Sequence, residues 1–306
     1  MPIKTQSDLP AKEILEKENI FVMDEKRAVH QDIRSIEIGI LNLMPLKEET
    51  ELQLLRSLSN TPLQVDVTFI TVSTHEFKNA SMSHLKKFYE TFSDIKHRFF
   101  DGLIITGAPI EQMEYEDVDY WGEICEIFEW TKTHVTSTLH LCWGAQAGIY
   151  YHYGLKKHLL PKKMFGVYEH RVMNRKVPLV RGFDDCFMAP HSRHTEVRAE
   201  DIRRVRELTI LAESCDAGVF LAVADEGRKI FVMGHPEYDR MTLDKEYKRD
   251  KNKGLSIALP VNYYPNDDDS AKPKLQWRSH GNILYSNWLN YYVYQVTPYD
   301  LAGTPF

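Results

Sequence analysis

The chain has 306 residues, with 38 Lys and Arg against 44 Asp and Glu, which gives a formal net charge of −6 when histidine is neutral. Hydrophobic residues make up 43 % and aromatic residues 11 %, which is enough to bury a substantial core and excludes a predominantly disordered chain. A mildly acidic chain is not expected to bind nucleic acid, because that affinity comes from clustered Lys and Arg.

The sequence predicts a cytoplasmic protein. The N-terminal residues lack the basic start and apolar segment of a secretory signal, and no run of about 20 apolar residues could span a membrane. The chain has four cysteines, and no two of them lie close together in the sequence, so neither a zinc site nor a disulfide scaffold is indicated. They are Cys125, Cys142, Cys186 and Cys215. We therefore expect reduced thiols.

Apolar runs alternate with helical periodicity through the first half of the chain. Residues 1–35 predict an irregular arm with a short helix near Ala11–Lys17. After the arm, we expect strands at Ile36–Leu43, Leu63–Val72, Phe100–Thr106 and Val135–Cys142, and helices at Lys47–Leu58, Ser83–Phe92, Asp117–Thr133 and Gly144–Tyr153. This alternation predicts an α/β fold, in which a mostly parallel sheet is flanked by helices on both faces.

The second half of the chain is less regular. Lys162–Phe187 predicts short strands and turns, compatible with an antiparallel extension of the sheet. Further elements are predicted as strands at Leu208–Ser214, Val219–Val223 and Ile230–Gly234, helices at Asp239–Lys253 and Ser279–Tyr294, and a surface loop at Asn262–Lys274. Because no repeat or long linker divides the chain, residues 36–306 are predicted to form a single domain, with two lobes as the alternative.

Cys142 lies where a buried strand is predicted to end and a helix of small residues to begin. A nucleophile on such a turn projects into the crevice above the carboxyl ends of the strands. The helix N-terminus favours a thiolate, and its free N–H groups can hold an oxyanion. The alternative is an inert buried thiol, because free cysteine is among the most buried residue types.

His235 directly follows another apolar strand, and Glu237 comes two residues later. A thiol nucleophile needs a base, and the base needs a group that fixes its tautomer. His235 and Glu237 meet both needs if their strand lies near the Cys142 strand. We expect no metal site, because no third ligand accompanies His191 and His194. The spacing of the glycines matches neither the dinucleotide-binding motif nor the Walker motif, so no bound nucleotide cofactor is expected.

The turn at Cys142 and the distal His-Pro-Glu are similar to those of class I glutamine amidotransferases. Several longer blocks narrow the resemblance to the homoserine O-acyltransferases of methionine biosynthesis, often called homoserine O-succinyltransferases. These blocks run from about Asn42 to Leu301 and are ILNLMPLKEETELQLLRSLSNTPLQV, ITGAPIE, LHLCWGAQAGIYYHYG, MFGVYEH, PHSRHTEV, MGHPEYD and NWLNYYVYQVTPYDL.

The resemblance implies a two-step acyl transfer from an acyl-coenzyme A (acyl-CoA) to L-homoserine. Cys142 would carry the acyl group as a thioester, His235 would be the general base, and Glu237 would orient His235. Substrate contacts are implied at Lys163, Ser192 and Arg249, and Lys47 and the Trp143 backbone N–H are implied near the oxyanion. Without the resemblance, a solvated charge is the preferred interpretation of Arg249, and the same applies to Lys163 in its basic run. The resemblance also suggests a homodimer. The aromatic residues at 291–294 could form its interface, although they could equally belong to the core.

The position that discriminates acyl donors in this family is Glu111 here. A glutamate would fill the space for a succinyl tail and repel its carboxylate, so we expect acetyl-CoA as the co-substrate, with succinyl-CoA as the alternative. Glu111 could also simply begin an acidic loop. Two other classes of protein are alternatives: a glutamine amidotransferase-like hydrolase, which would release ammonia from glutamine, and a redox sensor, which would not need His235 and Glu237.

Overall fold

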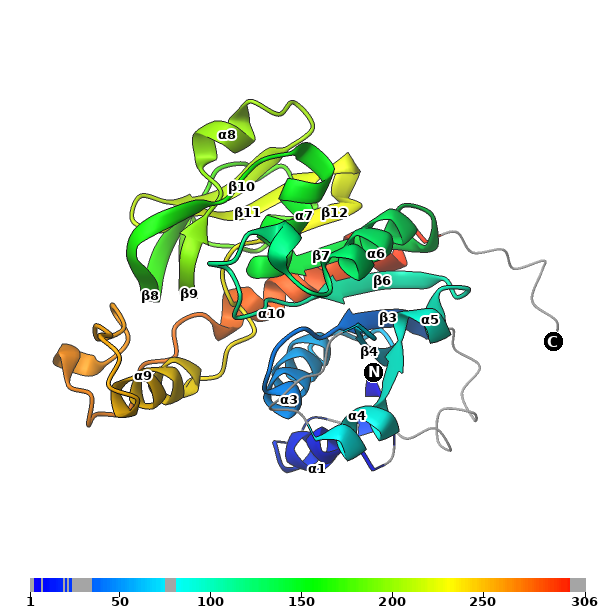
Figure 1. The fold of residues 1–306 in the computed structure, drawn as a ribbon, viewed down its shortest axis with the longest axis horizontal. Helices are drawn as coiled ribbons and strands as arrows, with labels where there is room; N and C mark the ends of the chain where they lie inside the picture. The colour runs from blue at the N-terminus through cyan, green and yellow to red at the C-terminus, as the bar shows by residue number, and fades with distance from the viewer. Residues whose placement is uncertain are drawn as a thin grey trace.

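The computed structural model describes residues 3–6, 8–18, 20, 22–23, 35–74 and 81–297. Within these residues the strands form one twelve-stranded sheet in the order β2-β1-β4-β3-β6-β7-β12-β11-β10-β8-β9, with β5 paired to β4 (Figure 1). Much of the predicted N-terminal arm, and the end of the family resemblance at Leu301, lie outside the described residues. The single domain predicted for residues 36–306 stays a prediction.

The half of the sheet that holds the N-terminal strands is parallel. Its strands are β1 (Ile3–Lys4), β2 (Val22–Met23), β3 (Ile36–Leu41), β4 (Val65–Thr71), β5 (Tyr89–Thr91), β6 (Phe100–Ile105), β7 (Val135–Leu141) and β12 (Lys229–Val232). Every residue of β6 is buried, as expected for a parallel strand that is covered on both faces. The predicted mostly parallel sheet is thus confirmed.

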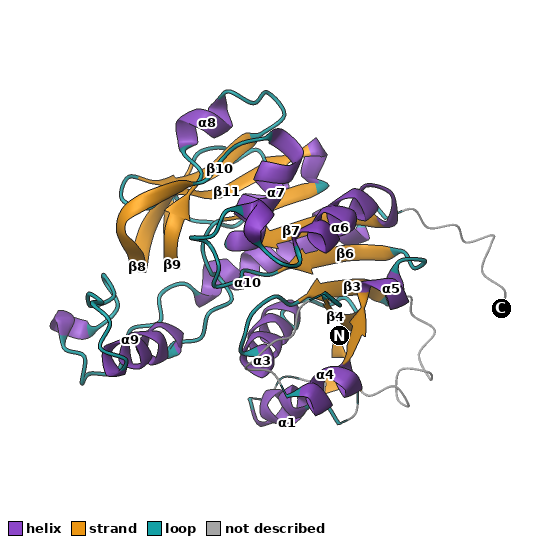
Figure 2. Ribbon diagram, in the orientation of Figure 1, coloured by secondary structure: helices purple, strands orange, loops and turns teal. Residues whose placement is uncertain are grey.

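Helices cover both faces of this parallel half. In Figure 2, α6 and α7 lie in front of the sheet, while α10 and the π-helix that follows it lie behind. The helices are α1 (Pro10–Lys17), α3 (Lys47–Leu58), α4 (Met82–Phe88), α5 (Phe92–Ile95), α6 (Trp121–His134), α7 (Trp143–Tyr153), α8 (Ala199–Arg203), α9 (Thr242–Asn252), α10 (Arg278–Asn287) and the π-helix η5 (Trp288–Tyr294). The short 3₁₀ segments are η1 (Tyr115–Asp117), η2 (Pro178–Val180), η3 (Asp225–Gly227) and η4 (Pro265–Asp267).

The antiparallel extension is longer than the sequence predicted. It consists of β8 (His158–Val172), β9 (Cys186–Glu196), β10 (Thr209–Ser214) and β11 (Gly218–Ala224). Strand β9 was not predicted, because it carries Pro190, two histidines and an arginine instead of an apolar run. Several of these polar residues are nevertheless buried, since β9 folds back on β8.

Two predicted helices differ from the observed elements. The predicted helix Ser83–Phe92 is broken, because β5 interrupts it to pair with β4 and a capping box at Thr91 and Asp94 then begins α5. The predicted helix Ser279–Tyr294 changes to a π-helix at Trp288. The arm contains the predicted short helix, α1, but it also adds β1 and β2 to the sheet edge.

Candidate active site

Cys142 lies at a strained turn between β7 and α7. Its φ of 48° and ψ of −110° place a non-glycine residue in a sparsely populated region. The backbone N–H of Cys142 donates to the Val232 carbonyl at 2.7 Å, which ties the turn to the end of β12. The residue is only 7 % exposed. The turn therefore has the geometry predicted for a nucleophile at the end of a strand.

Small residues allow α7 to begin directly against the sheet. A Cβ atom at Gly144 would lie 2.7 Å from the Thr106 carbonyl oxygen and 2.8 Å from that of Ile105. Ala145 and Ala147 are fully buried in the same helix. The close packing expected from Ala145, Ala147 and Gly148 is observed, and together with Gly144 it fixes the first turn of the helix beside Cys142.

His235 and Glu237 lie beside Cys142, just beyond the end of β12. The His235 backbone N–H donates to the Pro190 carbonyl at 2.9 Å, and the imidazole stacks on Tyr238 with ring centroids 4.0 Å apart. The Nδ1 atom of His235 lies 2.7 Å from Oε1 of Glu237, and both side chains are buried. The other carboxylate oxygen of Glu237, Oε2, is buried without a hydrogen-bond partner among the described residues.

The charges around His235 favour its protonated form. Burial alone would lower the pKa of His235, but the adjacent Cys142 sulfur and Glu237 carboxylate, each of which hydrogen-bonds to the ring, together hold that pKa well above its ordinary value. An imidazolium next to Cys142 stabilises a negative charge on the sulfur. The trio can therefore supply a nucleophile, a proton carrier and a group that orients the carrier.

Arg193 of β9 is a second buried cation near Cys142, and it was not predicted from the sequence. It is 1 % exposed, and its guanidinium donates to the carbonyls of Thr195 and Ala217, each at 2.6 Å. Burial lowers the pKa of Arg193, and the nearby Cys142 sulfur opposes that effect. No sequence signal pointed to Arg193, because its strand was not recognised.

A cavity of about 640 Å³ opens in front of Cys142 and His235. Four residues that the family resemblance implicates line it from separate parts of the chain: Glu111, Lys163, Ser192 and Arg249. The structure thus brings the implied substrate contacts and the donor-discriminating position to the same cavity as Cys142 and His235.

Glu246 is the centre of the charged side of this cavity, and it was not predicted. Its carboxylate accepts from Lys163 at 2.5 Å and from Ser192 at 2.7 Å, and it lies 3.8 Å from the Arg249 guanidinium. Asp250 pairs with Arg249 at 2.7 Å. The three-residue spacing of Glu246 and Arg249 on α9 places them on one helix face, which is the signal that could have found Glu246.

Glu111 contacts His194 in the cavity wall, with Oε1 of Glu111 2.8 Å from Nδ1 of His194. The Glu111 side chain is largely buried, and the His194 side chain is about one-third exposed. Glu111 therefore belongs to the cavity wall rather than to a solvated acidic loop.

The two residues implied near the oxyanion lie in different places. Trp143 begins α7, so its backbone N–H is one of the first-turn donors that have no partner within the helix. Lys47 is buried beneath the loop after β3, where its amine donates to the Asn42 carbonyl, and it is not among the residues that line the cavity. Burial lowers the pKa of Lys47 to about 7, although the nearby Glu51 opposes the effect.

Within the described part of the chain, no three His, Cys, Asp or Glu side chains are grouped so that they could hold a metal ion. No described helix combines the length and the apolar character needed to cross a bilayer.

Comparison with known proteins gives concordant results. A family model described as homoserine O-succinyltransferase matches residues 2–299. A homoserine O-acetyltransferase of Agathobacter rectalis is 75 % identical over 303 residues, covering 99 % of this chain and 98 % of the relative. A homoserine O-acetyltransferase of Geobacillus kaustophilus is 63 % identical over 300 residues, covering 98 % of this chain and 99 % of the relative.

Similar solved structures confirm the predicted fold. A glutamine amidotransferase from Thermotoga maritima superposes with a TM-score of 0.53 at 11 % identity, covering 84 % of this chain and 97 % of the other. One from Methylobacillus flagellatus gives a TM-score of 0.51 at 10 % identity, covering 84 % and 95 %. The fold is thus that of class I glutamine amidotransferases, and the full-length sequence matches show that the chain belongs to the homoserine O-succinyltransferase family.

Proposed function

We propose that the protein is a homoserine O-acetyltransferase of methionine biosynthesis, which transfers an acetyl group from acetyl-CoA to the hydroxyl of L-homoserine. The observation that carries the proposal is the placement of His235 between the Cys142 sulfur and the Glu237 carboxylate, at the edge of a cavity with a charged wall. The names of the similar proteins support the same activity.

In the first step, the Cys142 thiolate attacks the thioester carbonyl carbon of acetyl-CoA. The new C–Sγ bond forms as the bond from that carbon to the CoA sulfur breaks, and the His235 imidazolium gives its proton to the departing sulfur. We assign the transient oxyanion to the Trp143 backbone N–H, which has no partner within α7. Lys47 is the weaker candidate for this role, because its amine bonds to the Asn42 carbonyl.

In the second step, the homoserine hydroxyl oxygen attacks the acetyl-enzyme. Neutral His235 takes the hydroxyl proton as the C–O bond forms, and the C–Sγ bond breaks to regenerate the thiolate beside an imidazolium. Glu237 holds the imidazole in one orientation through both steps. Burial of Cys142 and His235 protects the thioester from hydrolysis by limiting the access of water.

The charged wall suits a zwitterionic amino acid. The Arg249 guanidinium, with a half-exposed side chain, can bind the homoserine carboxylate bidentately. We assign the ammonium group of homoserine to Glu246, which Lys163 and Ser192 hold in place. The variant Glu246→Gln should raise KM for homoserine while leaving the formation of the acetyl-enzyme unchanged.

Glu111 supports acetyl over succinyl as the transferred group. Its carboxylate is largely buried in the same cavity as Cys142, where the distal carboxylate of a succinyl group would meet a like charge. A paired kinetic assay tests this choice. Faster turnover with succinyl-CoA than with acetyl-CoA would overturn it.

The reaction class is tested by intact-protein mass spectrometry after mixing with acetyl-CoA alone. We expect a gain of one acetyl group that is lost when homoserine is added, and no such gain in Cys142→Ser. Full homoserine acetylation by Cys142→Ser would refute the covalent scheme. Ammonia release from glutamine would instead indicate an amidotransferase-like hydrolase.

We further propose that the enzyme acts in the cytoplasm as a homodimer and that residues 36–306 form a single domain. In the aromatic stretch suggested for dimer contacts, Tyr292 and Val293 are buried in the core, whereas Tyr294 is 49 % exposed. Only part of this stretch is therefore available to a partner. Light scattering on the purified protein would test the dimer, and a monomeric mass at the concentration of the assay would refute it.

A further inference from the structure

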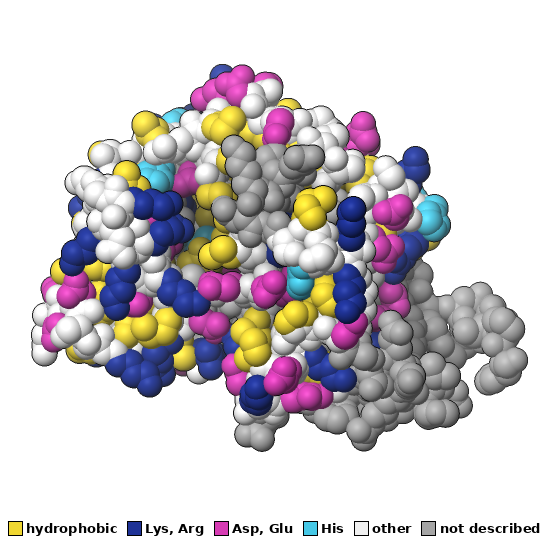
Figure 3. Space-filling view, turned by 60° about the horizontal axis from the view of Figure 1, so that its bottom comes forward, with side chains coloured by type: hydrophobic (Ala, Val, Ile, Leu, Met, Phe, Trp, Pro, Cys, Tyr) yellow, Lys and Arg dark blue, Asp and Glu magenta, His cyan; other side chains and the backbone are white. Residues whose placement is uncertain are grey.

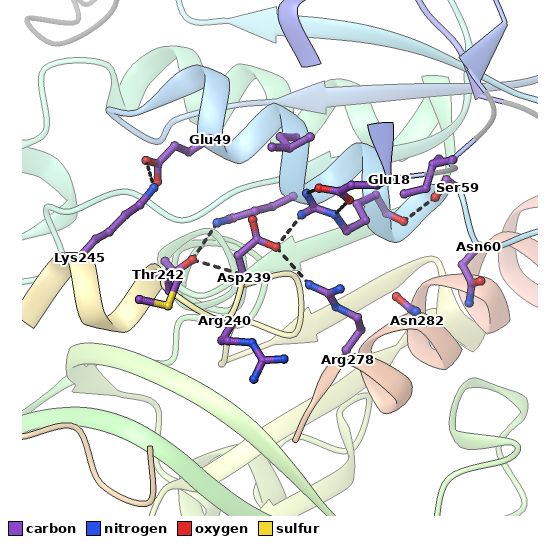
Figure 4. Close-up of a pocket in the computed structure, with 15 residues that line it drawn as sticks. Glu18, Glu49, Ser59, Asn60, Asp239, Arg240, Thr242, Lys245, Arg278 and Asn282 are labelled. Atoms are coloured by element: carbon purple, nitrogen blue, oxygen red, sulfur yellow. Dashed lines mark hydrogen bonds and ion pairs between the residues drawn. The ribbon is translucent and has the colours of Figure 1, made fainter. Parts of the chain in front are cut away.

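A second cavity of about 780 Å³ lies beside the active-site cavity. One helical face of α3 lines it, together with the segment 239–242 that leads into α9 and the first turns of α10 (Figure 4). The reaction proposed above leaves this cavity without a role.

The two cavities share a wall. Glu49 and Gln53 of α3 and Thr242 and Lys245 of α9 line both of them. Across this wall, Gln53 donates to the Thr242 hydroxyl at 2.9 Å, and Lys245 pairs with Glu49 at 2.6 Å. Both partners of the Lys245–Glu49 pair are substantially exposed, so the pair adds little stability and can rearrange for a ligand. A ligand that occupied both cavities would cross this shared wall.

Two guanidinium groups of the second cavity have capacity for an anion. Arg56 is engaged by Glu18 at 2.6 and 2.7 Å and by Asp239 at 2.5 Å. The contact between Arg278 and Asp239 is longer, at 3.4 Å, and the Arg278 side chain is 46 % exposed. Arg240 points away from Asp239 and donates to the Pro273 carbonyl at 2.9 Å (Figure 4). A guanidinium has five N–H donors, so these contacts leave donors on Arg240 and Arg278 for a ligand.

The rest of the second cavity is suited to the base of a nucleotide. Ile20, Leu52 and Met241 give it an apolar part, on which a flat ring can rest. In the face of the molecule shown in Figure 3, Lys and Arg side chains gather over the end that carries α9, interspersed with Asp and Glu.

We propose that the second cavity binds the phosphorylated nucleotide end of the CoA thioester, with Arg240 and Arg278 contacting its phosphates. Guanidinium groups match phosphate oxygens bidentately, and the apolar part receives the base. The arm of the thioester then crosses the shared wall and presents its carbonyl to Cys142. This assignment rests on the proposed acyl transfer from a CoA thioester.

The test compares two acetyl donors. Acetyl-CoA carries the nucleotide, whereas S-acetyl-N-acetylcysteamine keeps only the thioester end of the arm. For Arg240→Ala and Arg278→Ala, we expect kcat/KM with acetyl-CoA to fall roughly tenfold or more, which corresponds to the loss of one charged hydrogen bond. With the short thioester, the rate of acetylation should match that of the wild type. Arg204→Ala is the matched control, because Arg204 is an exposed arginine that lines neither cavity and pairs only on the surface with Asp201.

The outcomes separate this inference from the proposed function. If neither donor acetylates the wild-type protein, the proposed acyl transfer fails. Suppose instead that both donors acetylate the wild-type protein. The nucleotide site is then refuted if Arg240→Ala and Arg278→Ala keep full activity with both donors, or if they lose the same fraction of activity with each donor. Arg240→Lys guards against misfolding, because it retains a cation, and it should lose less with acetyl-CoA than Arg240→Ala. Adenosine 3′,5′-bisphosphate should compete with acetyl-CoA but not with the short thioester, and the absence of competition would also contradict the assignment.

Discussion

The variant Glu237→Gln tests the electrostatic role of the buried carboxylate. The amide can still accept a hydrogen bond from Nδ1 of His235, where the carboxylate oxygen lies at 2.7 Å, so shape is retained while the charge is lost. Replacing a charged hydrogen bond by a neutral one costs about 1–1.5 kcal/mol, and the Coulomb term at an effective dielectric of 20 reaches about 4 kcal/mol. At about 1.4 kcal/mol per factor of ten, acetylation of Cys142 should slow by roughly 10- to 1000-fold.

The assay is a single-turnover measurement of acetyl-enzyme formation across a range of pH. Glu237 helps to raise the pKa of His235, so its neutralisation lowers that pKa and the imidazolium is lost at a lower pH. The alkaline limb of the rate profile should therefore move toward lower pH. Glu237→Asp keeps the charge and should recover part of the rate. A Gln variant within twofold of the wild type, with an unmoved alkaline limb, would refute the assigned role.

Three further predictions concern other residues. Glu111→Gly should raise kcat/KM for succinyl-CoA relative to acetyl-CoA roughly 10- to 100-fold, because a like charge is removed from the cavity, and an unchanged ratio would count against the assigned specificity. For Lys47, the pKa of about 7 lies below the ordinary 10.5, so the unfolded chain holds more protons between these values. The difference in the free energy of unfolding between the wild type and Lys47→Met should therefore change with pH in that window. The wild type should gain up to about 1.4 kcal/mol per pH unit relative to the variant, which urea titrations would measure. Gly144→Ala should lower both Tm and the rate of Cys142 alkylation by iodoacetamide, since its Cβ would lie 2.7 Å from a backbone oxygen; unchanged values would mean that the helix shifts without cost.

The parallel half of the sheet was predictable because its strands are buried on both faces. The run of β6, for example, contains few polar residues, and its short length and the Gly-Ala-Pro turn that follows identify it as a strand. Strand β9 was not predictable in the same way. Its side chains are polar, and they are buried by contacts with distant elements, such as that of Gln146 with Thr195, which no local pattern reveals.

The same distinction applies to the candidate site. Cys142 and His235 each follow a buried strand, and neighbouring parallel strands bring such ends together at one edge. Glu246 was missed because its three-residue spacing from Arg249, the one local signal for it, is equally common on solvated faces of charged helices. Arg193 was missed because its burial depends on the hairpin of β8 and β9, which only the tertiary structure shows.

Strand β9 also links the two sides of the reacting centre. Its Pro190 carbonyl accepts a hydrogen bond from the His235 backbone. Its Thr195 exchanges hydrogen bonds with Gln146 in α7, the helix that follows Cys142, although the two residues are 49 positions apart in the chain. Pairings so remote in the chain are slow to form, because loop closure precedes their stabilisation. During refolding, helical content should therefore return before acyl transfer, and the reacting groups gain their alignment only when the hairpin docks.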